Sequence, residues 1–177
     1  MNKKGISKNI VLIGMSGSGK TVVGRFLSQK LNMKLKDTDD IIVLNSKKTI
    51  PYIFNEYGEK YFRDLESKVI DDLSSKTGLI ISTGGGVILN KDNIYLLKKK
   101  GILFFLRANI DTLVKNIELS FQTHRPLLDN NRELEDNIRN IYKKREKLYT
   151  SGADYIVKVD NKSVEEIGEE IIYILNK

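Results

Sequence analysis

The segment Gly14–Thr21 constrains the fold of this chain more than any other part of its sequence. It reads G-M-S-G-S-G-K-T and matches the pattern G-x-x-x-x-G-K-[S/T] at every fixed position. An apolar run at Asn9–Ile13 predicts a buried strand before it, and apolar residues at helical spacing predict a helix over 20–31. In this context the glycines let backbone N–H groups converge on phosphate oxygens, and the helix N-terminus favours negative charge. The segment therefore predicts a nucleoside triphosphate site rather than a plain glycine-rich turn.

Single positions of this loop carry separate predictions. Lys20 is expected to reach the β- and γ-phosphates, and the Thr21 hydroxyl is expected to bind Mg²⁺. We expect ATP to contact Gly17, Ser18, Gly19, Lys20, Thr21 and Val22. The motif alone does not say how the triphosphate is used. A length of 177 residues favours a minimal enzyme over helicases, and no N-K-x-D segment indicates a GTPase switch.

The rest of the chain alternates short apolar runs with longer amphipathic stretches. Strands are expected at 9–13, 34–37, 79–81, 102–106 and 155–159. Helices are expected at 20–31, 49–57, about 62–78 after an interruption at Gly58, 91–99, 111–117, 131–148 and from a capping box at 163 and 166 through 175. This order predicts a parallel sheet covered on both faces, with ligands at the carboxyl ends of its strands. We expect one domain over 1–177 and a mobile loop at 118–130.

Composition excludes several classes of site. The chain has no Cys and 1 His, which excludes a disulfide framework, a thiolate nucleophile and an imidazole-based zinc site. Its apolar runs are too short to span a bilayer and its basic N-terminus has no signal-peptide pattern, so we expect a cytoplasmic protein without a membrane partner. The net charge of +7 comes from lysines spread along the chain. We interpret it as a solvated surface that attracts anionic substrates, and not as a nucleic-acid site.

Two aspartates follow the second predicted strand. Asp37 and Asp39 stand one residue apart, so one carboxylate is available to Mg²⁺ and the other to an acceptor hydroxyl, as its base or anchor. The alternative is ordinary helix N-capping by Asp39 or Asp40. The expected position at the sheet edge, beside the phosphate loop, favours the functional interpretation.

Arginines supply the candidate anion-binding groups. Arg145 falls on the apolar stripe of the helix predicted at 131–148, where a guanidinium needs an anionic partner, either a structural carboxylate or a ligand. Arg63 has Glu59 and Glu66 one turn away on either side, which either pair with it at the surface or orient it towards a ligand. Arg125 lies in the predicted loop, where closure would bring it to the transferring phosphoryl group.

Gly84–Gly86 follows the third predicted strand and permits close approach of a ligand to the backbone. These features together describe a pocket for an anionic, hydroxylated small molecule beside ATP.

The ordered motifs of the chain resemble those of the shikimate kinase family. They are G-M-S-G-S-G-K-T at 14–21, D-T-D at 37–39, F-R-D-L-E at 62–66, S-T-G-G-G at 82–86, R-P-L-L at 125–128 and R-E-K-L-Y at 145–149. The resemblance implies an α/β, three-layer P-loop NTPase fold of the nucleoside-monophosphate-kinase type, with a five-stranded parallel sheet and helices on both faces. It also implies an acceptor-binding helical segment at about 39–75 and a lid at about 118–130.

The implied reaction transfers the ATP γ-phosphoryl group to the 3-hydroxyl of shikimate, in aromatic amino-acid biosynthesis. By the resemblance, Asp39, Lys20 and Arg125 are catalytic, Thr21 and Asp37 serve Mg²⁺, and Arg125 and Asn161 join the ATP-binding residues. The residues implied to bind shikimate are Asp39, Arg63, Gly84, Gly85, Gly86, Arg145, Phe54 and Phe62. Core packing is an equally good interpretation of the two phenylalanines.

The chain departs from the family pattern at one position of the lid. About seven residues before Arg125 the family usually carries a basic residue, and this chain has Glu118. Two other readings stay open: a different small-acceptor kinase of the same fold, such as a gluconate or nucleoside-monophosphate kinase, and a nucleotide-dependent nucleic-acid-binding protein. We expect a monomer in each case that involves a small acceptor.

Overall fold

A parallel sheet of five strands forms the centre of the computed structural model, which describes residues 7–122 and 131–177. The strands are β1 (Asn9–Ile13), β2 (Lys34–Asp37), β3 (Leu79–Ser82), β4 (Gly101–Arg107) and β5 (Tyr155–Lys158). Their order across the sheet is β2-β3-β1-β4-β5, and every neighbouring pair is parallel. Strand β1 is central and buried along its whole length, which explains its unbroken apolar sequence. The predicted parallel sheet is confirmed.

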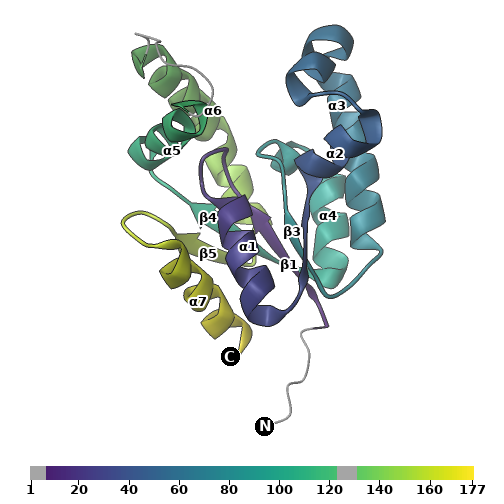
Figure 1. The fold of residues 1–177 in the computed structure, drawn as a ribbon, viewed down its shortest axis with the longest axis vertical. Coiled ribbons are helices and arrows are strands. Elements are labelled where there is room, and N and C mark those ends of the chain that lie inside the picture. Colours follow the sequence, from purple (N-terminus) through teal and green to yellow (C-terminus); the bar gives the residue numbers. More distant parts are fainter. Residues whose placement is uncertain (1–6, 123–130) are drawn as a thin grey trace.

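Helices cover both faces of this sheet (Figure 1). Helices α1 (Lys20–Leu31) and α7 (Val164–Leu175) pack together on one face. Helix α4 (Lys91–Lys100), α6 (Asn131–Gly152) and the later part of α3 (Ile50–Ser74) lie on the other face. The predicted three-layer fold is therefore confirmed.

Two further groups of helices stand at the carboxyl edge of the sheet. Helix α2 (Thr38–Ser46) and the start of α3 form an arm on one side, and α5 (Ile110–Gln122) packs on α6 at the other (Figure 1). None of the helices in the described ranges is long and apolar enough to cross a membrane.

Local capping signals position several helices as expected. The Thr49 side chain accepts from the Tyr52 N–H at the start of α3, and Ser163 with Glu166 forms the predicted capping box of α7. Gly58 interrupts α3 with non-helical angles, φ 79° and ψ 170°. The predicted break at this glycine is therefore confirmed.

Three sequence-based expectations need correction. Helix α5 continues through Gln122, so the loop predicted at 118–130 was wrong over 118–122, and its remaining residues lie outside the described ranges. Helix α2 was not predicted as a separate helix, although it lies almost wholly within the segment 39–75 that the family resemblance implies to be helical. Its N-cap is Asp37, whose side chain accepts from the Asp39 N–H, so the alternative of capping by Asp39 or Asp40 was also wrong.

The strand register brings three functional loops together. In the sheet, Ser82 of β3 pairs with Leu12 of β1 and with Asp37 of β2. Because these strands end at one level, the loops that follow them meet at one edge.

Candidate active site

The loop after β1 holds a buried lysine. The Lys20 ammonium donates to the carbonyl oxygens of Gly14 at 2.9 Å and Met15 at 2.8 Å. Burial lowers its pKa to about 8, although Asp39 and Asp37 act in the opposite direction. The ammonium is thus held beneath the loop by neutral carbonyl groups, at a position where phosphate oxygens would give it charged partners.

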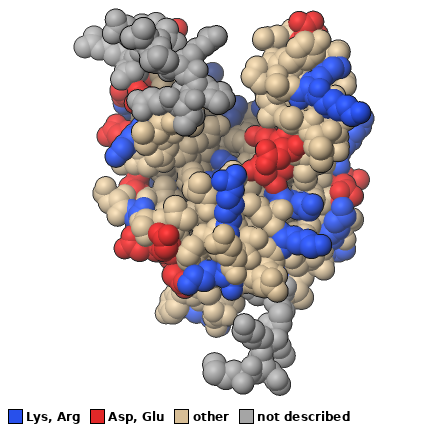
Figure 2. Space-filling model, in the orientation of Figure 1, with Lys and Arg blue, Asp and Glu red and all other residues tan. Residues whose placement is uncertain are grey.

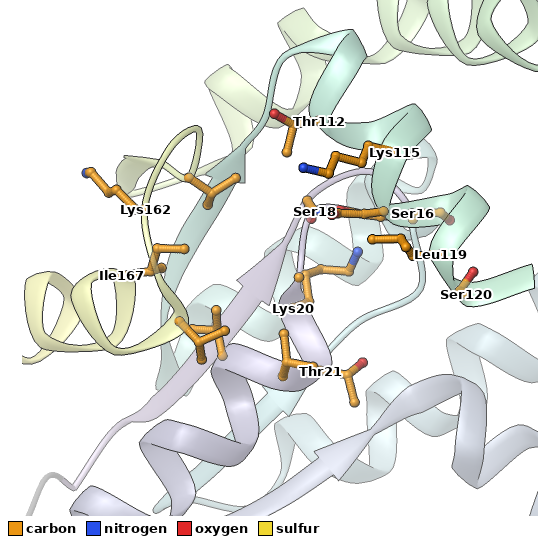
Figure 3. A pocket seen from close by; sticks show the side chains of 18 of the residues that line it. Ser16, Ser18, Lys20, Thr21, Thr112, Lys115, Leu119, Ser120, Lys162 and Ile167 are labelled. Carbon is orange, nitrogen blue, oxygen red and sulfur yellow. The ribbon is translucent and has the colours of Figure 1, made fainter. Parts of the chain in front are cut away.

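The first turn of α1 is open to a ligand. In the described chain no side chain caps α1, in contrast to α2, α3, α4 and α7, which have side-chain caps. Its orphan N–H groups border a cavity of about 760 Å³. The helix dipole and these N–H groups make this cavity suitable for the phosphates of a nucleotide (Figure 3).

We call this cavity the nucleotide pocket. The residues predicted to bind ATP all line it within the described ranges, namely Gly17, Ser18, Gly19, Lys20, Thr21, Val22 and Asn161. Arg125, the remaining member of the predicted set, lies outside the described residues. The opposite wall comes from α5 and the start of α7 and includes Thr112, Lys115, Asn116 and Ile167.

Oxygen donors suited to a magnesium ion meet beside this loop. The Thr21 hydroxyl donates to the Asp37 carboxylate at 2.8 Å and lies 3.3 Å from the Ser82 hydroxyl. Hydroxyl and carboxylate oxygens are the ligands that Mg²⁺ prefers when the substrate phosphates supply the rest of its shell. The donor set fits the predicted ion.

A second, smaller cavity of about 180 Å³ lies between the arm and the sheet. We call it the acceptor cavity. All eight residues predicted to bind the acceptor line it: Asp39, Phe54, Phe62, Arg63, Gly84, Gly85, Gly86 and Arg145. The two phenylalanine rings pack at 4.7 Å between centroids, so they contribute both to the cavity wall and to the core of the arm.

Arg63 is oriented by two glutamates. Its guanidinium pairs with the buried Glu66 at 2.9 Å and with the exposed Glu59 at 3.1 Å. The guanidinium also lies against Gly86, where a Cβ atom would come within 2.2 Å of it. A side chain at position 86 would therefore displace the Arg63 guanidinium from its place in the cavity lining. Glu59 pairs with Arg63 at the surface and Glu66 pairs with it in the interior, whereas orientation of Arg63 towards a ligand stays a prediction.

Arg145 reaches the cavity from α6. It donates to the Gly85 carbonyl oxygen at 3.2 Å, and it forms no ion pair with a carboxylate of the described residues. The structural ion pair considered for it is absent from this part of the chain. The buried Tyr149 hydroxyl donates to the same carbonyl oxygen, and burial raises its pKa to about 12. Arg145 thus keeps its charge available to an anionic ligand.

Two carboxyl groups face each other across Gly84. Asp39 Oδ1 and Glu66 Oε1 are both buried and have no hydrogen-bond partner within the described residues. A Cβ atom at Gly84 would come within 2.7 Å of Asp39 Oδ1 and 3.1 Å of Glu66 Oε1. Desolvation raises the pKa of Asp39, with a further contribution from Asp37, and desolvation also raises the pKa of Glu66 against the effect of Arg63. These atoms are available acceptors for ligand hydroxyl groups.

The two cavities share part of their lining. Ser16, Asp39 and Gly85 border both of them. A group bound by the loop after β1 and a group bound between Arg63 and Arg145 would therefore meet at Asp39. This arrangement suits transfer of a phosphoryl group between two bound molecules.

Two residues that contact the loops of the site were not predicted from the sequence as site residues. Tyr149 and Asn116 contact the glycines of the two loops, the latter by donating to the Gly17 carbonyl oxygen at 2.8 Å. Two signals were available for Tyr149: its place in the motif R-E-K-L-Y at 145–149, and its position four residues after Arg145, on the same helix face.

Comparison with known proteins finds relatives along nearly the whole chain. Residues 16–176 match the family model described as shikimate kinase. A shikimate kinase from Caldicellulosiruptor saccharolyticus is 42% identical over 167 residues, which cover 94% of this chain and 95% of that protein. A shikimate kinase from Thermodesulfovibrio yellowstonii is 38% identical and covers 93% of each.

Solved structures agree in fold. The structure of a shikimate kinase from Acinetobacter baumannii in complex with shikimate superposes with a TM-score of 0.87 at 30% identity, over 97% of this chain and 94% of that one. The family resemblance inferred from the ordered motifs is confirmed.

Proposed function

Because the chain belongs to the shikimate kinase family, we propose that it transfers the γ-phosphoryl group of ATP to the 3-hydroxyl of shikimate, giving shikimate 3-phosphate and ADP. The observation that carries the proposal is the acceptor cavity. It places two guanidinium groups, and two carboxyl oxygens that have no hydrogen-bond partner among the described residues, beside the phosphate-binding loop and the uncapped start of α1. A cyclic acid with several hydroxyl groups matches this combination of charges and hydrogen-bond acceptors.

The acceptor is held by its carboxylate. Arg63 and Arg145 bind that group with paired, charge-assisted hydrogen bonds, away from the reacting centre. Glu66 fixes the guanidinium of Arg63, and Phe54 with Phe62 packs against the apolar side of the ring. This clamp places the reacting hydroxyl at Asp39, where the two cavities meet.

Asp39 acts as the base for the acceptor hydroxyl. Its raised pKa makes its carboxylate a better proton acceptor than an exposed aspartate. Lys20 and the N–H groups at the start of α1 stabilise the charge on the phosphoryl oxygens during in-line transfer. Most of the rate enhancement therefore comes from positioning and charge neutralisation.

Thr21 and Asp37 would hold Mg²⁺, with Asp37 acting through water, and the ion would neutralise the phosphates. Arg125 is proposed to contribute a further positive charge there, on the sequence pattern alone.

The test measures ADP release from Mg-ATP by the purified protein, with and without shikimate. Strong stimulation by shikimate, with none by gluconate, AMP or CMP, is the expected result. Slow ADP release that shikimate does not stimulate would contradict shikimate as the acceptor. It would favour the alternative of another small-acceptor kinase of the same fold.

We further propose a monomer that works in the cytoplasm, without nucleic acid or membrane partners. The described residues predicted to bind ATP and the acceptor come together within one chain, and ATP is abundant inside cells. Light scattering should give the mass of one chain, 20.2 kDa, and a doubled mass would contradict it.

A further inference from the structure

Helix α5 is fixed against the phosphate-binding loop at Gly17. Asn116 donates to the Gly17 carbonyl oxygen at 2.8 Å, and a Cβ atom at Gly17 would come within 2.8 Å of the Leu113 carbonyl oxygen. The side of α5 that carries Thr112, Asn116 and Leu119 therefore forms a wall of the nucleotide pocket. Its spacing of three and four residues is that of one helix face.

Lys115 belongs to the same face of α5. It lines the nucleotide pocket, and Figure 3 shows its side chain extending from α5 over the phosphate-binding loop, next to Thr112. Among the residues that the structure describes, its ammonium has no hydrogen-bond or ion-pair partner. The other lysines of this lining are engaged, Lys20 with loop carbonyl groups and Lys162 with Glu170 at 2.6 Å.

We propose that Lys115 binds the phosphate chain of the nucleotide, as a second ammonium opposite Lys20. The inference rests on the proposed function in taking a nucleotide as the ligand of this pocket. Lys20 approaches the phosphates from beneath the loop, and Lys115 approaches from α5, on the side of Gly17 and Ser18. A triphosphate carries more charge than one ammonium neutralises, so a second cation within reach lowers its free energy.

Lys115 is expected to bind the nucleotide equally strongly in the ground state and in the transition state. ATP and ADP share the part of the phosphate chain that lies over Gly17 and Ser18, so the same ammonium serves substrate and product. Such uniform binding changes KM for ATP and the Kd of ADP, and leaves kcat nearly unchanged. The acceptor cavity does not include Lys115, so KM for shikimate stays the same.

The experiment compares wild-type protein with Lys115→Gln and Lys115→Arg by calorimetry, using ATP, ADP and adenosine as ligands without shikimate. Lys115→Gln is expected to weaken ATP and ADP binding about tenfold, the size of one lost charge-assisted hydrogen bond. Adenosine, which has no phosphate, should bind all three proteins equally. Lys115→Arg should keep most of the affinity for ADP.

Lys68→Gln is the matched control, because Lys68 is an exposed helical lysine of α3 that lines neither cavity. It should bind ADP like the wild type, and both glutamine variants should unfold at the wild-type temperature. Unchanged ADP affinity in Lys115→Gln would overturn the inference, as would an equal loss of ADP and adenosine binding. If ADP binding depends on Lys115 but shikimate does not stimulate turnover, the inference stands and the proposed function fails.

Discussion

Lys20 couples nucleotide binding to pH. Burial holds its pKa at about 8 in the free protein, whereas bound phosphates favour the charged ammonium. ADP affinity should therefore be nearly constant up to about pH 7 and fall as the pH rises through about 8, by up to about tenfold per pH unit. Calorimetric titration with ADP between pH 7 and 9.5 measures it. Lys20→Arg, which stays charged, should show a flat profile, and a flat wild-type profile would contradict the prediction.

Asp39 is the residue on which turnover should depend most. Asp39→Asn keeps the size of the side chain and removes the proton acceptor, so kcat should fall by about 10²- to 10⁴-fold while KM for shikimate changes little. Steady-state kinetics with ATP and shikimate measure the changes in kcat and KM. Asp40→Asn, at the exposed neighbouring position of α2, should behave like the wild type. Normal turnover in Asp39→Asn would refute its role as base.

We expect Tyr149 to affect acceptor binding through Gly85 and Arg145, which it contacts or neighbours at the cavity. In Tyr149→Phe the Gly85 carbonyl oxygen keeps only the Arg145 hydrogen bond, so Arg145 is less free to turn to a ligand. KM for shikimate should rise about fivefold, the equivalent of about 1 kcal/mol, with kcat and KM for ATP unchanged. Tyr142→Phe is the control, because that hydroxyl bonds Glu146 on the same helix and lines neither cavity. An equal rise of KM for shikimate and KM for ATP in Tyr149→Phe would contradict this role of Tyr149.

At the scale of elements, the break in α3 determines how the arm meets the sheet. Gly58, with φ 79° and ψ 170°, separates Phe54 from Phe62 and Arg63, all of which line the acceptor cavity. Gly58→Ala should destabilise the protein by about 1–3 kcal/mol and raise KM for shikimate, because alanine strains this backbone conformation. Urea unfolding and steady-state kinetics measure the two effects.

Gly78→Ala separates strain from function. Gly78 also has a positive φ, 71°, and open space around its missing side chain, but it lines neither cavity. The variant should lose stability with no change in KM for shikimate. An unchanged KM in Gly58→Ala would show that the break does not position the cavity.

Elements whose signals are local could be predicted from the sequence. The strand at β1, the loop at Gly14–Thr21 and the capping box of α7 are each specified by neighbouring residues. The hydrophobic pattern did not predict α2 as a separate helix, because its apolar residues are consecutive and show no helical period. In the structure Ile42 is buried and Leu44 is largely exposed. Contacts such as Tyr149 with Gly85, 64 residues apart, depend on how elements pack and have no local signal.

At the scale of the whole molecule, the charge of +7 is distributed rather than gathered. Figure 2 shows lysine and arginine side chains scattered over one face among acidic groups, and that face is hollowed beside the arm. Such a surface favours encounter with small anions. The positively charged side chains proposed to bind the two ligands line the two cavities: Lys20 and Lys115 in the nucleotide pocket, and Arg63 and Arg145 in the acceptor cavity.

A ligand bound in either cavity should raise the free energy of unfolding, independently of the other cavity. A ligand at 100 times its Kd adds about 2.7 kcal/mol, which for a chain of this size raises Tm by about 5–10 °C. Shikimate and ADP should each give such a shift in wild-type protein. Arg145→Ala should lose the shift with shikimate and keep the shift with ADP, as thermal unfolding would show. Loss of both shifts would mean that Arg145 supports the fold rather than the acceptor.

The shared lining at Ser16, Asp39 and Gly85 has a consequence for inhibitor design. Because the two cavities share these lining residues, one compound with a carboxylated ring tethered to an adenosine polyphosphate should bind in both of them at once. Tethering replaces the second encounter by an intramolecular one, which raises effective concentration to about the millimolar range for a short linker. The shared border that suits phosphoryl transfer should thus make the enzyme sensitive to a bridging ligand.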